Sequence, residues 1–190
     1  MEKQIIDDQE FEKFQLIDGC SYEFNGCTFK NCDFSKASFR QSEFIECRFE
    51  NCDLSMVQMD ATVLNHVSFS KCKVMGVDFS KCSKFLFAVS FDECLLNFSV
   101  FHKNDLRNST FKNSILKEAT FVEVNLTSVK FINCDLENTV FDRSNLEKSD
   151  FTTARNYSFD PEVNRMKKAR FSMPDVVRLL SKYDILISES

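Results

Sequence analysis

The strongest constraint on the fold is a large apolar residue, most often phenylalanine, that recurs every five residues. Phenylalanine alone makes up 22 of the 190 residues. The first run of these central positions is Phe24, Phe29, Phe34, Phe39, Phe44, Phe49, Leu54, Met59, Leu64, Phe69, Val74 and Phe79. A second run, displaced by two residues, is Phe91, Leu96, Phe101, Leu106, Phe111, Leu116, Phe121, Leu126, Phe131, Leu136, Phe141, Leu146 and Phe151. A globular core needs no such period, whereas a solenoid of stacked repeats does.

The residue two positions before each centre is small or compact. Residues two apart on an extended chain point to the same side, so the small residue and the large one both face inward. The next small residue comes three positions later, so a corner must rotate the chain between units. The position just before the centre is often polar, and we expect these side chains to hydrogen-bond at the corners: Asp33, Asp53, Asp78, Asp105, Asn125, Asp135, Asn145 and Asp150.

This small–polar–large–x–x unit resembles the consensus of the pentapeptide-repeat family, small–Asp/Asn–Leu/Phe–x–x, and more than twenty units match. The resemblance implies an all-β fold, a right-handed quadrilateral β-helix with four units in each coil. Residues 20–155 would then form one solenoid of about six and a half coils stacked about 4.8 Å apart. Residues 1–19 would cap its first coil through Phe11, Phe14, Leu16 and Ile17, and residues 156–190 would form a C-terminal cap and dimerisation tail.

The nine cysteines suggest a buried role rather than disulfides or a metal site. Only Cys20 lies outside the inward small column, which holds Cys27, Cys32, Cys47, Cys52, Cys72, Cys82, Cys94 and Cys134. A free cysteine behaves as a small buried hydrophobe, and the spacings do not match a zinc site. The sequence therefore predicts reduced thiols and a cytoplasmic protein. The charged N-terminal stretch lacks an apolar run, so we expect neither a signal peptide nor a membrane span.

No group of residues in the sequence suggests catalysis. His66 and His102 fall at outward positions, and the three glycines are scattered, so no phosphate-binding loop is present. The sequence therefore predicts a protein that is not an enzyme and that holds no cofactor and no metal.

The five-residue period slips by two between Phe79 and Phe91, near residues 81–85. Continuing the first frame would bury Lys84 as a centre without a partner, which is costly. The second frame makes Leu86 a centre and leaves Phe85, Phe87 and, just beyond, Phe98 pointing outward. Such a break is either a bulge whose rings fold over the junction or an exposed apolar patch for a protein partner. The bulge is favoured because surface apolar residues are common; Phe85, Phe87 and Phe98 remain the candidate partner-binding residues.

The C-terminal segment has a different pattern. Ser172 is a candidate helix cap with Pro174 in the first turn, and residues 184–188 (DILIS) are predicted to form a short strand. A helix followed by an apolar strand resembles the C-terminal ends of the Qnr and McbG branch of the family, and residues 160–165 (DPEVNR) resemble McbG in particular. In Qnr-type proteins this segment forms a two-fold dimer, which makes the following residues candidates for a homodimer interface: Val176, Leu179, Leu180, Tyr183, Ile185 and Ile187.

The Qnr and McbG resemblance implies a protein that binds DNA gyrase or topoisomerase IV and protects it against a quinolone or a microcin. Members of the branch are described as mimics of duplex DNA, and the charge gives this description weak support. The net charge is −5, and residues 20–155 hold eighteen acids against sixteen bases, whereas duplex DNA of the same length, about 31 Å, carries about 18 negative charges. The alternative is a rigid scaffold for an unrelated protein partner. Neither interpretation involves direct binding of nucleic acid.

Overall fold

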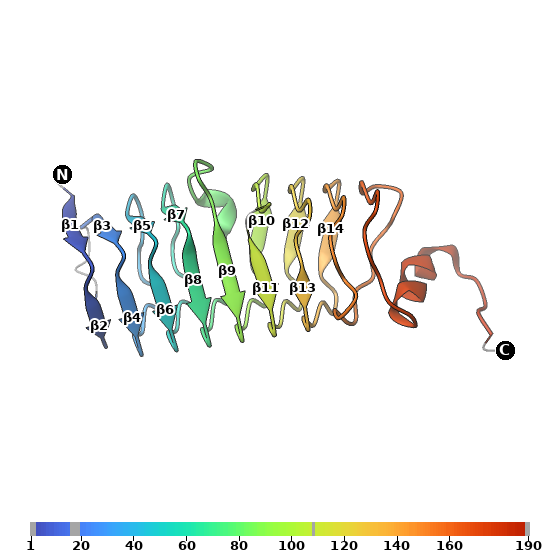
Figure 1. Cartoon of the computed structure of the whole chain (residues 1–190), viewed down its shortest axis with the longest axis horizontal. Coiled ribbons are helices and arrows are strands. Elements are labelled where there is room, and N and C mark those ends of the chain that lie inside the picture. Colours follow the sequence, from blue (N-terminus) through green and yellow to red (C-terminus); the bar gives the residue numbers. More distant parts are fainter. Residues whose placement is uncertain (1–2, 16–19, 108, 189–190) are drawn as a thin grey trace.

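The computed structural model describes residues 3–15, 20–107 and 109–188, which form a parallel β-solenoid of about seven turns (Figure 1). Ladders of parallel pairing run along the rod on four faces. The first face carries β1 (Gln4–Asp7), β3 (Tyr22–Asn25), β5 (Glu43–Ile45) and β7 (Val63–Asn65). The second face carries β2 (Glu10–Glu12), β4 (Thr28–Lys30), β6 (Arg48–Glu50), β8 (Val67–Ser70), β9 (Val89–Asp92), β11 (Thr110–Lys112) and β13 (Phe131–Ile132).

The third face is held by single bridges, which run from Asp33↔Asp53 to Asp135↔Arg155. The fourth face carries β10 (Val100–His102), β12 (Thr120–Val122) and β14 (Val140–Asp142), and one 3₁₀-helix, η1 (Phe79–Lys81), lies in its third coil. Paired residues are twenty apart, as in Phe29↔Phe49. Four five-residue units therefore make one coil, as the resemblance implies.

The large centres and the small column form the core, as predicted. Phe101, Phe121 and Phe141 stack with ring centroids 4.8 and 5.0 Å apart and nearly parallel planes. All eight cysteines of the small column are buried, and Cys20 is partly exposed. Serine occupies the same column elsewhere: the Ser144 hydroxyl donates to the Phe121 carbonyl at 3.1 Å, as the Cys47 thiol does to the Phe24 carbonyl at 3.2 Å. The column therefore accepts cysteine and serine, which hydrogen-bond to a carbonyl of the neighbouring coil, and also Val57 and Ala119, which have no side-chain donor.

The corners use the polar residue before each centre, as predicted. The Asp33, Asp53 and Asp78 carboxylates each accept the backbone N–H two residues later at 2.9 Å. After the centres that follow Asp33 and Asp53, the second residue then takes a positive φ, 59° at Lys36 and 57° at Met56. This left-handed conformation is costly for residues other than glycine, and the sequence pattern alone did not reveal it. The Asx hydrogen bond and the inter-coil ladder hold it in place.

Parallel pairing extends beyond residues 20–155 at both ends. At the N-terminus, β1 and β2 pair with β3 and β4, and Phe11 stacks on Phe29 at 5.2 Å. Leu16 and Ile17 of the predicted cap lie outside the described residues. At the C-terminus the ladder continues through Asn145↔Arg165 and Asp150↔Arg170, and Phe151 stacks on Phe171 at 5.2 Å. The last coil lacked a five-residue signal because its centres are Met166 and Phe171, separated from Phe151 by an irregular stretch.

The C-terminal helix forms, but differently from the prediction. It is a 3₁₀-helix, η2 (Asp175–Tyr183). Its N-cap residue is Pro174, and no side chain caps this end of the helix by a hydrogen bond. The prediction that the Ser172 side chain caps the helix is therefore wrong. Instead, the backbone carbonyl of Ser172 accepts a hydrogen bond from the Val176 N–H at 3.1 Å. The predicted strand 184–188 is also wrong, because these residues lead away from the end of the rod and no strand of the described residues lies beside them (Figure 1). A strand forms only where a neighbouring edge supplies hydrogen bonds.

Candidate protein-binding site

Two surplus residues enter the solenoid between η1 and β9. Before the break Phe49 pairs with Phe69, twenty residues away, and across it Phe69 pairs with Phe91, twenty-two residues away. After the break the twenty-residue register returns. The surplus residues project as a loop above the rod (Figure 1). We call residues 83–86 the crest.

The crest exposes two large apolar side chains. Phe85 is 73% and Leu86 is 56% exposed, whereas Phe87 is only 5% exposed. The Phe87 ring packs edge-on against Phe79 at 6.3 Å. The predictions that Phe87 points outward and that Leu86 is an inward centre are therefore wrong. The chain turns back to the core at Leu86, which has a φ of 53°, so Phe87 is the first side chain that reaches the interior.

Hydrogen bonds tie the crest to the neighbouring coil. The Lys84 ammonium donates to the carbonyls of Ser80 and His102, both at 3.0 Å, and partial burial lowers its pKa. The Phe85 N–H donates to the Ser83 hydroxyl at 3.3 Å. A hollow of about 230 Å³ lies beside the crest, lined by His66, Lys84, Leu86, Phe87, Ala88, Asp105 and Arg107. These hydrogen bonds hold the crest in place against the rod. Lys84 faces outward, as expected because burying an unpaired lysine is costly.

Phe98 is exposed as predicted, at 51%, but it does not join the crest. It lies at a corner of the third face, in the column that contains Met56 and Gly76. Met56 is 55% exposed, and its side chain lies over Gly76. A Cβ atom added to Gly76 would lie 3.3 Å from the Cγ atom of Met56. The structure therefore separates the three candidate residues: Phe85 on the crest, Phe98 on another corner and Phe87 in the core.

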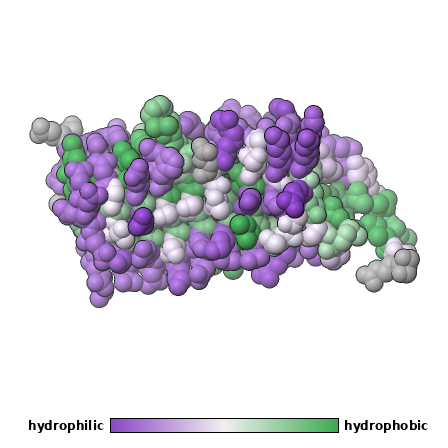
Figure 2. Space-filling model, in the orientation of Figure 1, coloured by the Kyte–Doolittle hydropathy of each residue, from purple (hydrophilic) through white to green (hydrophobic). Residues whose placement is uncertain are grey.

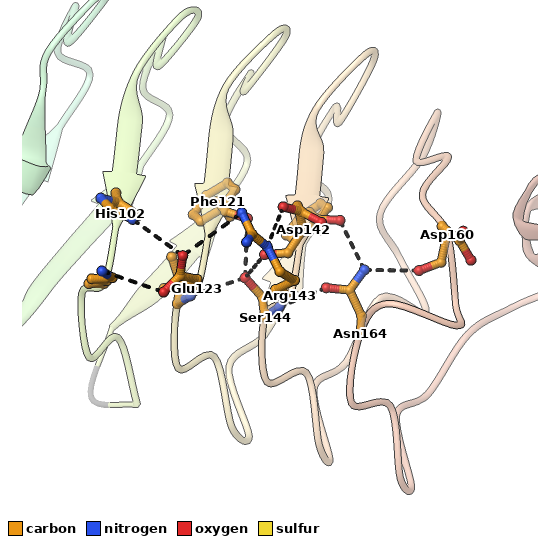
Figure 3. Close-up of polar contacts among 11 residues, drawn as sticks. His102, Phe121, Glu123, Asp142, Arg143, Ser144, Asp160 and Asn164 are labelled. Atoms are coloured by element: carbon orange, nitrogen blue, oxygen red, sulfur yellow. Dashed lines mark hydrogen bonds and ion pairs between the residues drawn. The ribbon is translucent and has the colours of Figure 1, made fainter.

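Outward charges pair along the rod rather than gathering on one face. Lys73 with Asp53 and Lys112 with Asp92 are pairs between adjacent coils, at 3.4 and 3.0 Å. The hydrogen bond from Lys112 lowers the pKa of Asp92. Figure 3 shows Glu123 between basic side chains of the coils on either side, with Arg143 and His102 at 3.8 and 3.7 Å. Many carboxylates are thus paired with the neighbouring coil, which leaves no continuous acidic stripe along the described part of the rod.

The candidate dimer residues divide into buried and exposed groups. Leu179 is 7% exposed, and Val176 packs partly buried against the core, so both cover the end of the solenoid. Leu180, Tyr183, Ile185 and Ile187 are 38%, 46%, 53% and 53% exposed. Leu186, which the helical and strand patterns did not single out, is fully exposed. Figure 2 shows this end of the molecule as an apolar surface.

The part of the chain described by the structure contains no group of three or more His, Cys, Asp or Glu residues arranged to hold a metal ion. Across the same described ranges, no helix has the length and apolarity needed to cross a lipid bilayer.

Comparison with known proteins shows the family. A model of the pentapeptide repeat region matches residues 22–84 and again 42–121, and a model of eight pentapeptide repeats matches residues 119–155. No curated protein matches the sequence. Among solved structures, a trypsin-treated variant of QnrB1, a plasmid-mediated fluoroquinolone resistance protein, is similar with a TM-score of 0.54 and 19% identity over 98% of both chains. HetL, involved in heterocyst differentiation regulation in the cyanobacterium Nostoc, is similar with a TM-score of 0.51 and 13% identity over 90% of both chains. At these identities the solved structures show a shared fold, and together with the family models they lead to one conclusion: the chain belongs to the pentapeptide-repeat family.

Proposed function

We propose that this protein is a non-enzymatic binding protein of the cytoplasm that contacts DNA gyrase or topoisomerase IV and protects or modulates it. The observation that carries the proposal is the crest, where Phe85 and Leu86 project from a largely polar rod. Large apolar side chains presented on a braced loop are typical energetic anchors of protein interfaces. The fold shared with QnrB1 and the resemblance of residues 160–165 to the McbG tail favour a type II topoisomerase as the partner.

The charge distribution favours binding to the topoisomerase through apolar side chains rather than through a polyanionic surface that mimics duplex DNA. Carboxylates such as Asp53, Asp92 and Glu123 are paired with cations of adjacent coils. A surface neutralised in this way attracts a DNA-binding groove less strongly than a polyanion does. We therefore assign specificity to the crest and place the solenoid face in a supporting role.

A gyrase supercoiling assay tests the proposal. Purified protein is added to DNA gyrase, and in parallel to topoisomerase IV, with and without a quinolone or a microcin. Restored supercoiling, or a change in cleavage complexes, supports the function. Absence of any effect in supercoiling, cleavage and pull-down assays rejects it and favours the scaffold for an unrelated partner.

A double substitution tests the crest within the same assay. Phe85→Ser with Leu86→Ser removes the apolar tip and should weaken topoisomerase binding at least tenfold, while the melting temperature stays close to that of the wild type. Met56→Gln is the matched control, because Met56 is similarly exposed and lies on another face. Equal loss of activity in the control, or full activity of the double variant, would show that the crest is not the anchor.

A further inference from the structure

A regular backbone hydrogen bond closes the corner between the fourth and first faces of the rod. At this corner the N–H of the second residue after a centre donates to the carbonyl nineteen residues later, in the next coil. Before the break, the Gln41 N–H donates in this way to the Asp60 carbonyl at 2.9 Å. After the break, the Lys103 N–H donates to the Val122 carbonyl at 3.1 Å. A carbonyl that loses this donor needs another partner.

Two carbonyls lose this donor where the surplus residues enter the chain. The Ala61 N–H donates at 2.9 Å to the Lys81 carbonyl, twenty residues later, and so bypasses the Ser80 carbonyl. The Lys81 N–H in turn points back to the Asp78 carbonyl at 3.4 Å. With the two surplus residues counted, its regular acceptor would be the His102 carbonyl. The break therefore takes the usual backbone donors from the carbonyls of Ser80 and His102.

The Lys84 ammonium supplies both of the missing hydrogen bonds. It donates to the Ser80 carbonyl and to the His102 carbonyl, each at 3.0 Å. Ser80 lies in η1, before the break, and His102 lies in β10, after it. An ammonium can donate to several acceptors at once, and a charged donor makes a stronger bond than a neutral one. One side chain of the crest thus joins the coils on both sides of the break.

The exposed tip of the crest lies between two fixed residues. Lys84, directly before the tip, is held by its two hydrogen bonds. Phe87, directly after it, is buried, and its ring packs against Phe79. Only Phe85 and Leu86 lie between them, and both are exposed. Apolar side chains that are already ordered lose less conformational entropy when a partner binds them.

We propose that Lys84 is the positioning residue of the crest. By replacing the two lost ladder bonds, it holds Phe85 and Leu86 in the orientation in which the protein partner binds them. Lys84 acts on its own chain and does not itself contact the partner. Without its hydrogen bonds the tip keeps its apolar side chains but becomes mobile, and binding must then order it, which lowers the affinity. The inference rests on the proposed function for the partner, whereas the order of the crest is measured on the protein alone.

Hydrogen–deuterium exchange of residues 83–88 measures the order of the crest in the full chain. Lys84→Met keeps much of the side-chain length but has no donor, and should speed exchange in this segment at least about tenfold. Lys84→Arg keeps several N–H donors and should stay within about twofold of the wild type. Lys81→Met is the matched control, because Lys81 is an exposed lysine of the same turn, and it should leave the exchange unchanged.

Tryptophan fluorescence provides a second measurement of crest order. The chain contains no tryptophan, so Phe85→Trp places a single fluorophore on the crest. Adding Lys84→Met to this variant should lower the fluorescence anisotropy, whereas adding Lys81→Met should not. Thermal unfolding shows whether each variant is folded; if Lys84→Met is not, Lys84→Gln takes its place and should also loosen the crest. A crest as ordered as that of the wild type in the folded Lys84 variant overturns the proposal.

A double-mutant cycle tests whether Lys84 acts through the tip. Lys84→Met should weaken binding to gyrase at least about fivefold when Phe85 and Leu86 are present. In the chain that carries Phe85→Ser and Leu86→Ser, the same substitution should weaken it less than about twofold, because no apolar tip is left to position. Equal losses in both chains would show that Lys84 acts independently of the tip and would overturn the proposal. If the wild type does not bind gyrase, the proposed function fails, while exchange and anisotropy still decide whether Lys84 orders the crest.

Discussion

At the residue scale, each position of the repeat has one physical task. Phe121 is fully buried and stacks between Phe101 and Phe141 at 4.8 and 5.0 Å. Leucine fills the neighbouring centres, for example Leu116 and Leu126, which are also fully buried. The interior therefore tolerates changes between large apolar side chains and excludes charge.

Substituting Phe121 tests this assignment. Phe121→Asp buries an unpaired carboxylate and should lower the free energy of unfolding by at least about 4 kcal/mol. Phe121→Leu should cost only about 1–2 kcal/mol, because leucine occupies equivalent positions. Urea unfolding followed by circular dichroism measures both. Two variants as stable as the wild type would show that the ring is not in the core.

Buried thiols predict a loss of stability at alkaline pH. Burial raises the pKa of Cys47 and Cys134 from 9.0 to about 12. Above pH 9 the unfolded chain loses these protons and the folded chain keeps them, so the stabilisation is present below pH 9 and falls as the pH rises toward 12. Between pH 9 and 10 the loss is about 1 kcal/mol for each thiol.

Serine substitutions provide the control for that pH dependence. Cys47→Ser with Cys134→Ser should flatten the decline measured by urea unfolding under reducing conditions, since serine does not titrate there and Ser144 fills the same column. Thiol labelling should find one reactive cysteine, Cys20, in the native protein and nine after denaturation without reductant. An unchanged pH profile in the double variant, or fewer than nine thiols, would contradict the inward assignment.

At the element scale, the corner is the unit that turns a five-residue pattern into a solenoid. The Asp78 carboxylate accepts the Ser80 N–H at 2.9 Å, and Asn125 makes the equivalent bond to Thr127 at 3.2 Å. Aspartate and asparagine are therefore interchangeable in this bond, because both present an oxygen at the same place. The same bond recurs at Asp160, beyond the regular repeats, where it accepts the Glu162 N–H at 2.8 Å.

Substitutions at Asp78 separate the corner bond from the charge. Asp78→Ala leaves the Ser80 N–H without its acceptor and should cost about 1 kcal/mol of unfolding free energy. Asp78→Asn keeps an acceptor and should cost about half of that or less. Thermal unfolding of the three proteins at neutral pH measures the difference. Equal destabilisation by alanine and asparagine would mean that the charge matters and the hydrogen bond does not.

At the scale of the whole molecule, acids and bases nearly balance along the rod, and ion pairs between coils keep the opposite charges close together. Lys73–Asp53, Lys112–Asp92 and Arg143–Glu123 each join adjacent coils. Exposed pairs of this kind add little stability individually. Their larger consequence is that the long-range field of the rod is weak compared with that of duplex DNA.

Binding to a topoisomerase should accordingly depend little on salt. Raising the salt concentration from about 0.1 to about 0.3 M should change the affinity of this protein for gyrase by less than about threefold, because few counterions are released. Duplex DNA bound to the same enzyme serves as the reference and should lose far more affinity. A slope as steep as that of DNA would support polyanionic mimicry and contradict the apolar anchor.

The sequence by itself determined the solenoid, its four units per coil through the family resemblance, the inward cysteines and the corner role of residues such as Asp33 and Asp53. Each of these depends on contacts that repeat every five or twenty residues, so the pattern is visible locally. Tertiary structure decided the rest. The position at which the two surplus residues leave the solenoid decided whether Leu86 or Phe87 points into the core. The strand predicted at residues 184–188 did not form because no described strand of the same chain lies beside it to supply hydrogen bonds. The last coil escaped the pattern because Asn164 and the 156–163 loop replace a regular unit there. Non-local packing and hydrogen bonding decide such positions, and these are the places where the surface becomes distinctive.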